Sequence, residues 1–91
     1  MVESRHWSVD IFIDEHEDER TTRAEARLHT NDQTQLVGRG TARRNPKDTD
    51  IAEIGDELAV ARALSNLAHE LLDAAASDIE GITHEHVHLH S

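Results

Sequence analysis

One uninterrupted helical pattern, residues 56–80, constrains the fold of this 91-residue chain more than any other feature. At 100° per residue its apolar side chains fall in one arc about 140° wide. The arc contains Val60, Ala61, Leu64, Leu67, Ala68, Leu71, Leu72, Ala75 and Ile79. Acidic residues open the stretch, where they suit the positive end of the helix dipole, and Gly81 is expected to end it. The pattern predicts one long amphipathic helix within residues 55–81.

Three segments of alternating polarity come before this helix, at 7–14, 22–30 and 35–44. Period-two alternation predicts strands with one buried face. That face is formed by Trp7, Val9, Ile11 and Ile13, then Ala24, Ala26 and Leu28, then Leu36, Gly38, Gly40 and Ala42. The charged run 15–19 is expected to form a solvated hairpin loop, and residues 31–33 a tight turn. Residues 6–46 are therefore predicted to form an antiparallel β-meander.

Two glycines on the inner face of the third strand indicate how the helix packs. Gly weakens a strand unless another segment approaches closely, so Gly38 and Gly40 predict a helix lying tightly across them. The expected fold is α+β with β-β-β-α order, in which the helix covers one face of a three-stranded sheet. The chain forms a single domain, 1–91, with residues 82–91 as a His-rich tail that could add a short strand.

The lengths of these elements predict self-association. A 25-residue helix spans about 37 Å, whereas an eight-residue strand spans about 27 Å. The helix should overhang the sheet, and Leu72, Ala75 and Ile79 continue its apolar arc there. Exposed apolar surface of this kind usually meets a partner. We therefore expect a homodimer in which these residues lie at the interface, with exchanged helices or tails as one way to form it.

The formal net charge of −10 conceals a segregation of charge, because residues 1–47 hold eight of the nine Lys and Arg side chains. The overall acidity argues against non-specific attachment to nucleic acid or to anionic membrane, so any RNA contact must be local. No segment approaches the roughly 18 apolar residues of a membrane span, and the N-terminus lacks an apolar signal core. These features predict a soluble cytoplasmic protein.

The outward face of the predicted sheet is a candidate RNA platform. Arg23, Arg27, Arg39 and Arg43 project from it beside Phe12, and guanidinium groups fork onto phosphates while a ring can stack on a base. Two alternatives stay open. Cross-strand ion pairs with Asp10, Asp14 and Glu25 would neutralise this face, or Phe12 and Val37 would form a protein interface.

Two further clusters lie at the ends of segments. Arg43, Arg44 and Lys47 lie at a strand end and the start of a loop, which favours RNA contact, with solubility as the simpler explanation. His84, His86, His88 and His90 would share one face of a strand, a geometry that can chelate Zn²⁺, Ni²⁺ or Cu²⁺. Their spacing matches no established zinc motif, so adventitious metal binding is the alternative.

Catalytic patterns are absent from the sequence. There is no Cys and no G-x-S-x-G motif, and Gly38 and Gly40 lie inside a strand rather than in a phosphate loop. The paired carboxylates stand in a solvated run where nothing would raise a pKa. The chain is therefore predicted not to be an enzyme and to need no cofactor.

Several blocks resemble a known family: DEHE at 14–17, TRAEARL at 22–28, LVGRG at 36–40, ARRNP at 42–46, EIGDEL at 53–58, ARALS at 61–65, and the ending 78–84. The family is a small actinobacterial group of uncharacterised proteins with a double-stranded-RNA-binding-domain-like fold. Its fold is similar to that of ribosome hibernation-promoting factors, which silence translation on the small subunit. The resemblance covers nearly the whole chain, residues 7–89, and implies no catalytic residues.

The resemblance and the basic residues together suggest a dimeric cytoplasmic protein that acts on the translation machinery under stress or dormancy by steric occlusion. Ribosomal RNA would be its partner. The alternative is a regulatory or structural protein-interaction module whose acidic surface binds a basic protein and which does not bind RNA.

Overall fold

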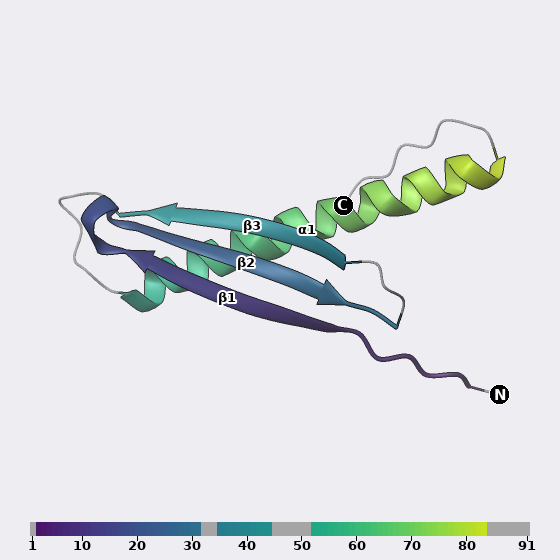
Figure 1. Ribbon diagram of the computed structural model, residues 1–91, viewed down its shortest axis with the longest axis horizontal. Helices are drawn as coiled ribbons and strands as arrows, with labels where there is room; N and C mark the ends of the chain where they lie inside the picture. The colour runs from purple at the N-terminus through teal and green to yellow at the C-terminus, as the bar shows by residue number, and fades with distance from the viewer. Residues whose placement is uncertain (1, 32–34, 45–51, 84–91) are drawn as a thin grey trace.

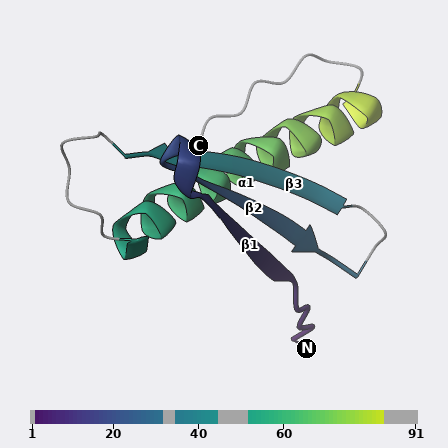
Figure 2. The ribbon, with the colours of Figure 1, turned by 60° about the vertical axis from the view of Figure 1, so that its left-hand side comes forward.

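Alternating polarity produces three strands of equal length, followed by one helix. The computed structural model describes residues 2–31, 35–44 and 52–83. In order along the chain, the elements are β1 (Ser8–His16), the 3-10 turn η1 (Glu17–Glu19), β2 (Thr21–His29), β3 (Gln35–Arg43) and α1 (Ala52–Thr83). The strands form one antiparallel sheet in the order β1-β2-β3, and α1 packs on one of its faces (Figures 1 and 2). The predicted α+β fold is confirmed.

The connection between β1 and β2 is tighter than the predicted loop. β1 continues through His16, and only Glu17–Glu19 turn. Arg20 leaves this turn with a left-handed backbone, at φ 53°, and its N–H donates to the Glu17 carbonyl at 3.1 Å. A residue with a Cβ disfavours that conformation by roughly 1–2 kcal/mol, so the surrounding hairpin must hold Arg20 in place.

The glycines of β3 allow α1 to approach closely, as predicted. A Cβ on Gly38 would collide with the backbone of Ala63 and Leu67, and one on Gly40 with that of Ala59 and Ala63. The core is correspondingly made of small side chains. Its buried members are Ala24, Ala26, Leu28, Ala42, Ala59, Ala63 and Leu67, with Leu36, Val60 and Leu71 packed against them.

Two polar side chains of α1 lie at the free edge of β3. The Arg62 guanidinium donates to the Thr41 carbonyl at 2.7 Å, and the Asn66 amide donates to the Arg39 carbonyl. Both carbonyls point away from β2, because Arg44 pairs with Arg20 and antiparallel ladders bond through alternate residues. These bonds hold one side of α1 over this edge of the sheet.

The buried face of α1 differs from the predicted apolar arc. Ala59, Ala63 and Leu67 face the sheet, whereas Ala61, Leu64 and Ala68 of the predicted arc are exposed. The reason is the close approach at β3. The helix backbone at Ala59, Ala63 and Leu67 lies against Gly38 and Gly40, so the helix turns these residues inward and carries the larger part of the predicted arc to the side.

Both ends of α1 extend beyond the predicted helix. It begins at Ala52 and continues through Gly81 to Thr83, so the prediction that Gly81 ends it is wrong. Gly81 does not adopt a positive φ, and an interior glycine weakens a helix by only about 1 kcal/mol. At the other end, a Cβ on Gly55 would lie 3.1 Å from the Thr22 hydroxyl, so this glycine lets the first turn lie beside β2.

The inner face of β1 is the main departure from the sequence prediction. Val9, Ile11 and Ile13 pair directly with Leu28, Ala26 and Ala24, and therefore share the face on which α1 packs. Together with Trp7 they are nevertheless 37–52% exposed. In Figures 1 and 2, α1 lies along β2 and β3 and then projects beyond the sheet, which leaves most of β1 without cover. The predicted overhang is confirmed, but burial of these four side chains is not.

Candidate functional site

The polar face of the sheet brings the predicted arginines together. The register places Phe12, Glu25 and Arg39 side by side across the three strands, with Asp14, Arg23 and Thr41 in the row beside them. Residues directly opposite in antiparallel strands project from the same face. The predicted outward face is therefore formed as the alternation indicated.

Carboxylates pair with three of these arginines. Glu25 accepts from Arg27 Nε at 2.6 Å and lies 3.1 Å from Arg39 Nη2 through its other oxygen. Arg23 lies 3.4 Å from Glu19. The hydrogen bond from Arg27, together with the charges of both arginines, lowers the pKa of the Glu25 carboxyl. Glu25 thus neutralises the centre of the face, as the ion-pair alternative predicted.

The other two acids of that alternative do not pair with arginine. Asp10 lies 2.7 Å from His29 Nε2, and no ion pair of Asp14 is seen among the residues that the structure describes.

Phe12 is exposed but already has a neighbour. The Arg27 guanidinium lies 5.4 Å from the centre of its ring, within the range of a cation–π contact. One surface of the ring is therefore covered within the chain, and a base could stack on that surface only after Arg27 moved.

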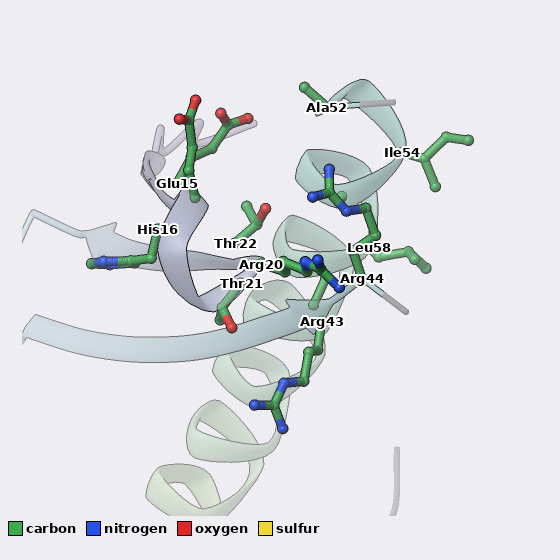
Figure 3. Close-up of a pocket in the computed structure, with 13 residues that line it drawn as sticks. Glu15, His16, Arg20, Thr21, Thr22, Arg43, Arg44, Ala52, Ile54 and Leu58 are labelled. Carbon is green, nitrogen blue, oxygen red and sulfur yellow. The ribbon is translucent and has the colours of Figure 1, made fainter. Parts of the chain in front are cut away.

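A second group of basic residues lies at one end of the sheet, around an open pocket of about 660 Å³. The hairpin brings Arg20 opposite Arg44, whose N–H donates to the Arg20 carbonyl at 2.9 Å. In Figure 3 the side chains of Arg20 and Arg44 extend between the β1–β2 turn and the first turns of α1, whereas Arg43 points away from the helix start. The remaining lining residues are Glu15, His16, Glu17, Thr21, Thr22, Ala42, Ala52, Ile54, Gly55 and Leu58.

This pocket combines cations with acids and apolar side chains. Arg20, Arg43 and Arg44 can hold an anion, but Glu15 and Glu17 also line the pocket. Arg43 and Arg44 were predicted contact residues, and Lys47 lies outside the described residues. Arg20 was not predicted. Its signal was the antiparallel register of β2 with β3, which pairs Thr21 with Arg43 and so places residue 20 beside residue 44.

No arrangement of side chains typical of a catalytic site is seen among residues 2–31, 35–44 and 52–83. The hydroxyl of buried Thr21 donates to the Glu19 carbonyl at 3.0 Å and so faces backbone rather than a base. In the same ranges, no group of three His, Asp or Glu side chains could hold a metal ion. His84, His86, His88 and His90 lie outside these ranges. No helix in the described part of the chain is long and apolar enough to cross a membrane.

A third candidate site is an apolar surface. Arg62 and Asn66 fix the side of α1 that lies over the free edge of β3. Leu64 lies about 200° around the helix from each of them, so it faces the side of β1. We call Val9, Ile11 and Ile13 of β1, together with Leu64 of α1 and with Ala61 and Ala68 beyond it on the helix side away from the sheet, the open apolar surface; all six are exposed.

The predicted dimer residues lie farther along the same helix. Ala75 and Ile79 are exposed and Leu72 is half-buried. Over the exposed arc between residues 58 and 79 no position is charged, although charged residues make up 31% of the chain. The arc contains Leu58, Ala61, Leu64, Ser65, Ala68, Leu72, Ala75, Ala76 and Ile79, of which Leu72 and Ala76 are half-buried and the others exposed.

Comparison with known proteins agrees with this architecture. The sequence profile described as Rv2632c-like matches residues 5–88. The chain belongs to the Rv2632c-like family. It is 50% identical to the uncharacterized protein Rv2632c of Mycobacterium tuberculosis over 91 residues, covering 96% of this chain and 95% of that one. It is also 54% identical to the uncharacterized protein Mb1767 of Mycobacterium bovis over 81 residues, covering 89% and 83%.

The fold of the family is known from a crystal structure of Rv2632c. That structure matches with a TM-score of 0.81 and 46% identity, over 92% of this chain and 96% of that chain. A sheet of three antiparallel strands followed by a long helix is thus common to both proteins. The names of these relatives describe no activity, so any function must be argued from the surfaces of the molecule.

Proposed function

We propose that this protein is a non-catalytic cytoplasmic protein-interaction module that acts by covering a partner's surface. The observation that supports this proposal is the open apolar surface. Val9, Ile11 and Ile13 continue the inner face of the sheet, yet no part of α1 covers them enough to bury them. Contiguous apolar surface rimmed by polar residues marks interaction sites in soluble proteins.

The polar face supports protein contact rather than RNA contact. Phosphate binding relies on guanidinium groups that are free to pair, whereas Arg23, Arg27 and Arg39 each have a carboxylate within 3.4 Å. Exposed ion pairs contribute only about 0–1 kcal/mol, so phosphates could displace the carboxylates. The displaced Glu25 and Glu19 would then repel the phosphates.

A photo-crosslinking amino acid, placed at a chosen position of this protein in its living host, tests the proposal directly. Position 11 lies on the open apolar surface, and position 12 is the adjacent residue on the opposite face of the same strand. We expect protein adducts from Ile11 and few from Phe12. Equal labelling at both positions, or none at either, would contradict the proposal.

A second candidate function is ribosomal RNA binding of the hibernation-factor type under stress or dormancy. The observation that favours it is the convergence of Arg20, Arg43 and Arg44 at one end of the sheet. Its test is sedimentation of ribosomes from starved cells. Co-migration that is lost in an Arg20→Glu/Arg43→Glu variant and kept in Arg27→Glu would support it. A protein found only in the top fractions would exclude it.

A further inference from the structure

We propose that a second copy of this chain covers the open apolar surface, with the exposed arc of α1 in each copy lying over β1 of the other. This inference rests on the proposed function, because it names the protein that the interaction surface binds. Its basis is that the molecule carries an uncovered sheet strand and an uncovered helix side next to each other. One two-fold rotation can cover both at once.

The sizes of the side chains make the two uncovered parts complementary. β1 presents the branched side chains of Val9, Ile11 and Ile13, which project far from the strand. The middle of the exposed helix arc presents the short side chains of Ala61, Ser65 and Ala68, which leave room for them. Within one chain, α1 approaches the strand that carries the smallest residues: Gly38 and Gly40 of β3 face Ala59 and Ala63 of α1. A helix can therefore approach β1 closely only with a small-residue face such as this one.

The distribution of charge also favours association of two copies through this surface. Two chains of net charge −10 repel each other overall, which opposes association through acidic surfaces. The exposed arc between residues 58 and 79 carries no charge, and neither do Val9, Ile11 and Ile13 on the inner face of β1. Apolar burial is then the available driving force.

The available area is close to what a stable dimer needs. The nine residues of β1 span about 30 Å, and a helix side or the adjoining sheet floor is about 10 Å wide. The floor and the helix side together offer roughly 600 Å² per copy, against about 800 Å² in an interface of standard size. Leu72, Ala75 and Ile79 continue the helix side beyond the sheet and would supply the difference.

Mass measurements on the purified full-length chain test the association. In sedimentation equilibrium over a range of protein concentrations, we expect a dimer for the native protein and for Phe12→Asp. Ile11→Asp and Leu64→Asp should weaken dimerisation about 30-fold or more, since a buried interfacial side chain contributes at this level. Both residues are exposed in the single chain, so circular dichroism should show that the variants still fold.

Disulfide trapping tests the geometry independently, because the chain has no cysteine of its own. Ile11→Cys and Ala68→Cys are purified separately, mixed and oxidised. We expect a crosslinked species containing one copy of each, and none when Phe12→Cys replaces Ile11→Cys. A dimer that survives Ile11→Asp, or that crosslinks only between Phe12→Cys and Ala68→Cys, would overturn the inference.

A monomer at every concentration would also overturn the inference, and photo-crosslinking then distinguishes its failure from that of the proposed function. If the adduct at position 11 contains a different protein, the second copy is the wrong occupant and the interaction module stands. If the chain is a monomer and position 11 forms no adduct, both proposals fail.

Discussion

The two edge strands of the sheet, β3 and β1, differ in what their inner faces carry. On β3, Gly38 and Gly40 leave room for α1, and the helix backbone fills it. On β1, Val9, Ile11 and Ile13 are larger and more hydrophobic, yet they remain exposed. The helix thus lies over the strand whose inner face carries the smallest residues. Close contact along the helix backbone there outweighs contact with bulky side chains elsewhere.

This difference shows that the most apolar strand of a small domain need not be the best covered. A single helix about 10 Å wide covers roughly two strands, which lie about 4.8 Å apart. The third strand is left for another molecule. Four measurements test the contrast between β3 and β1.

The largest effect is expected from Gly40→Ala. Its Cβ would collide with the backbone of Ala59 and Ala63, which cannot move without shifting the helix. Overpacking typically costs 1–3 kcal/mol, and a clash with backbone lies at the upper end, so we expect a loss of about 3 kcal/mol in urea unfolding. The same substitution at Gly81, where nothing lies within 4 Å, should stabilise the helix by about 0.5–1 kcal/mol. Equal effects at both sites would refute the close-approach argument.

Two leucines on neighbouring turns of α1 test whether burial against the sheet or side-chain hydrophobicity alone determines the contribution to stability. Leu67 is buried against the sheet, whereas Leu64 is 42% exposed. Leu67→Ala should cost about 2–4 kcal/mol, and Leu64→Ala less than about 1 kcal/mol in dilute protein. Thermal unfolding at several concentrations sharpens the comparison. If α1 covers β1 of a second copy, the penalty of Leu64→Ala should grow with concentration; a constant penalty would speak against it.

The free edge of β3 should make a smaller contribution. Arg62→Met removes the bond to the Thr41 carbonyl while keeping a side chain of similar helix propensity. We expect a loss of about 0.5–1.5 kcal/mol, together with faster hydrogen exchange along β3. Glu70→Met provides the control, since it also removes one charge from the same helix at equal propensity. If both variants lose the same stability, the bond to β3 contributes nothing.

The polar face of the sheet should give the smallest effect. The pKa of Glu25 is lowered chiefly by the hydrogen bond from Arg27, then by the charges of Arg27 and Arg39. Because its folded pKa lies below its unfolded value, Glu25 stabilises the protein above that unfolded pKa, and the stabilisation is lost as pH falls through the folded pKa. NMR titration should place its midpoint below the ordinary value of 4.5. Arg27→Gln should raise that midpoint more than Arg39→Gln; the reverse order would mean that Arg27 is not the main partner.

Local pattern was sufficient for the fold and for part of the site. Alternation predicted which residues of each strand share a face, and Gly38 and Gly40 predicted the tight helix contact. The same alternation placed Arg23, Arg27 and Arg39 on one face but could not decide whether Glu25 would neutralise them. That outcome depends on register, since Glu25 lies directly beside Arg39 across the strands and two residues from Arg27.

The residue pattern alone specified the strands and the helix, because side-chain periodicity and glycine placement act within a few neighbouring residues. The rotation of α1 and the exposure of β1 were settled instead by packing between distant segments. These depend on backbone contact at Gly38 and Gly40 and on bonds from Arg62 and Asn66 to β3, which join residues 21 and 27 positions apart. An apolar arc shows that a helix has a side to bury; the shape of the sheet determines which part of that arc is buried.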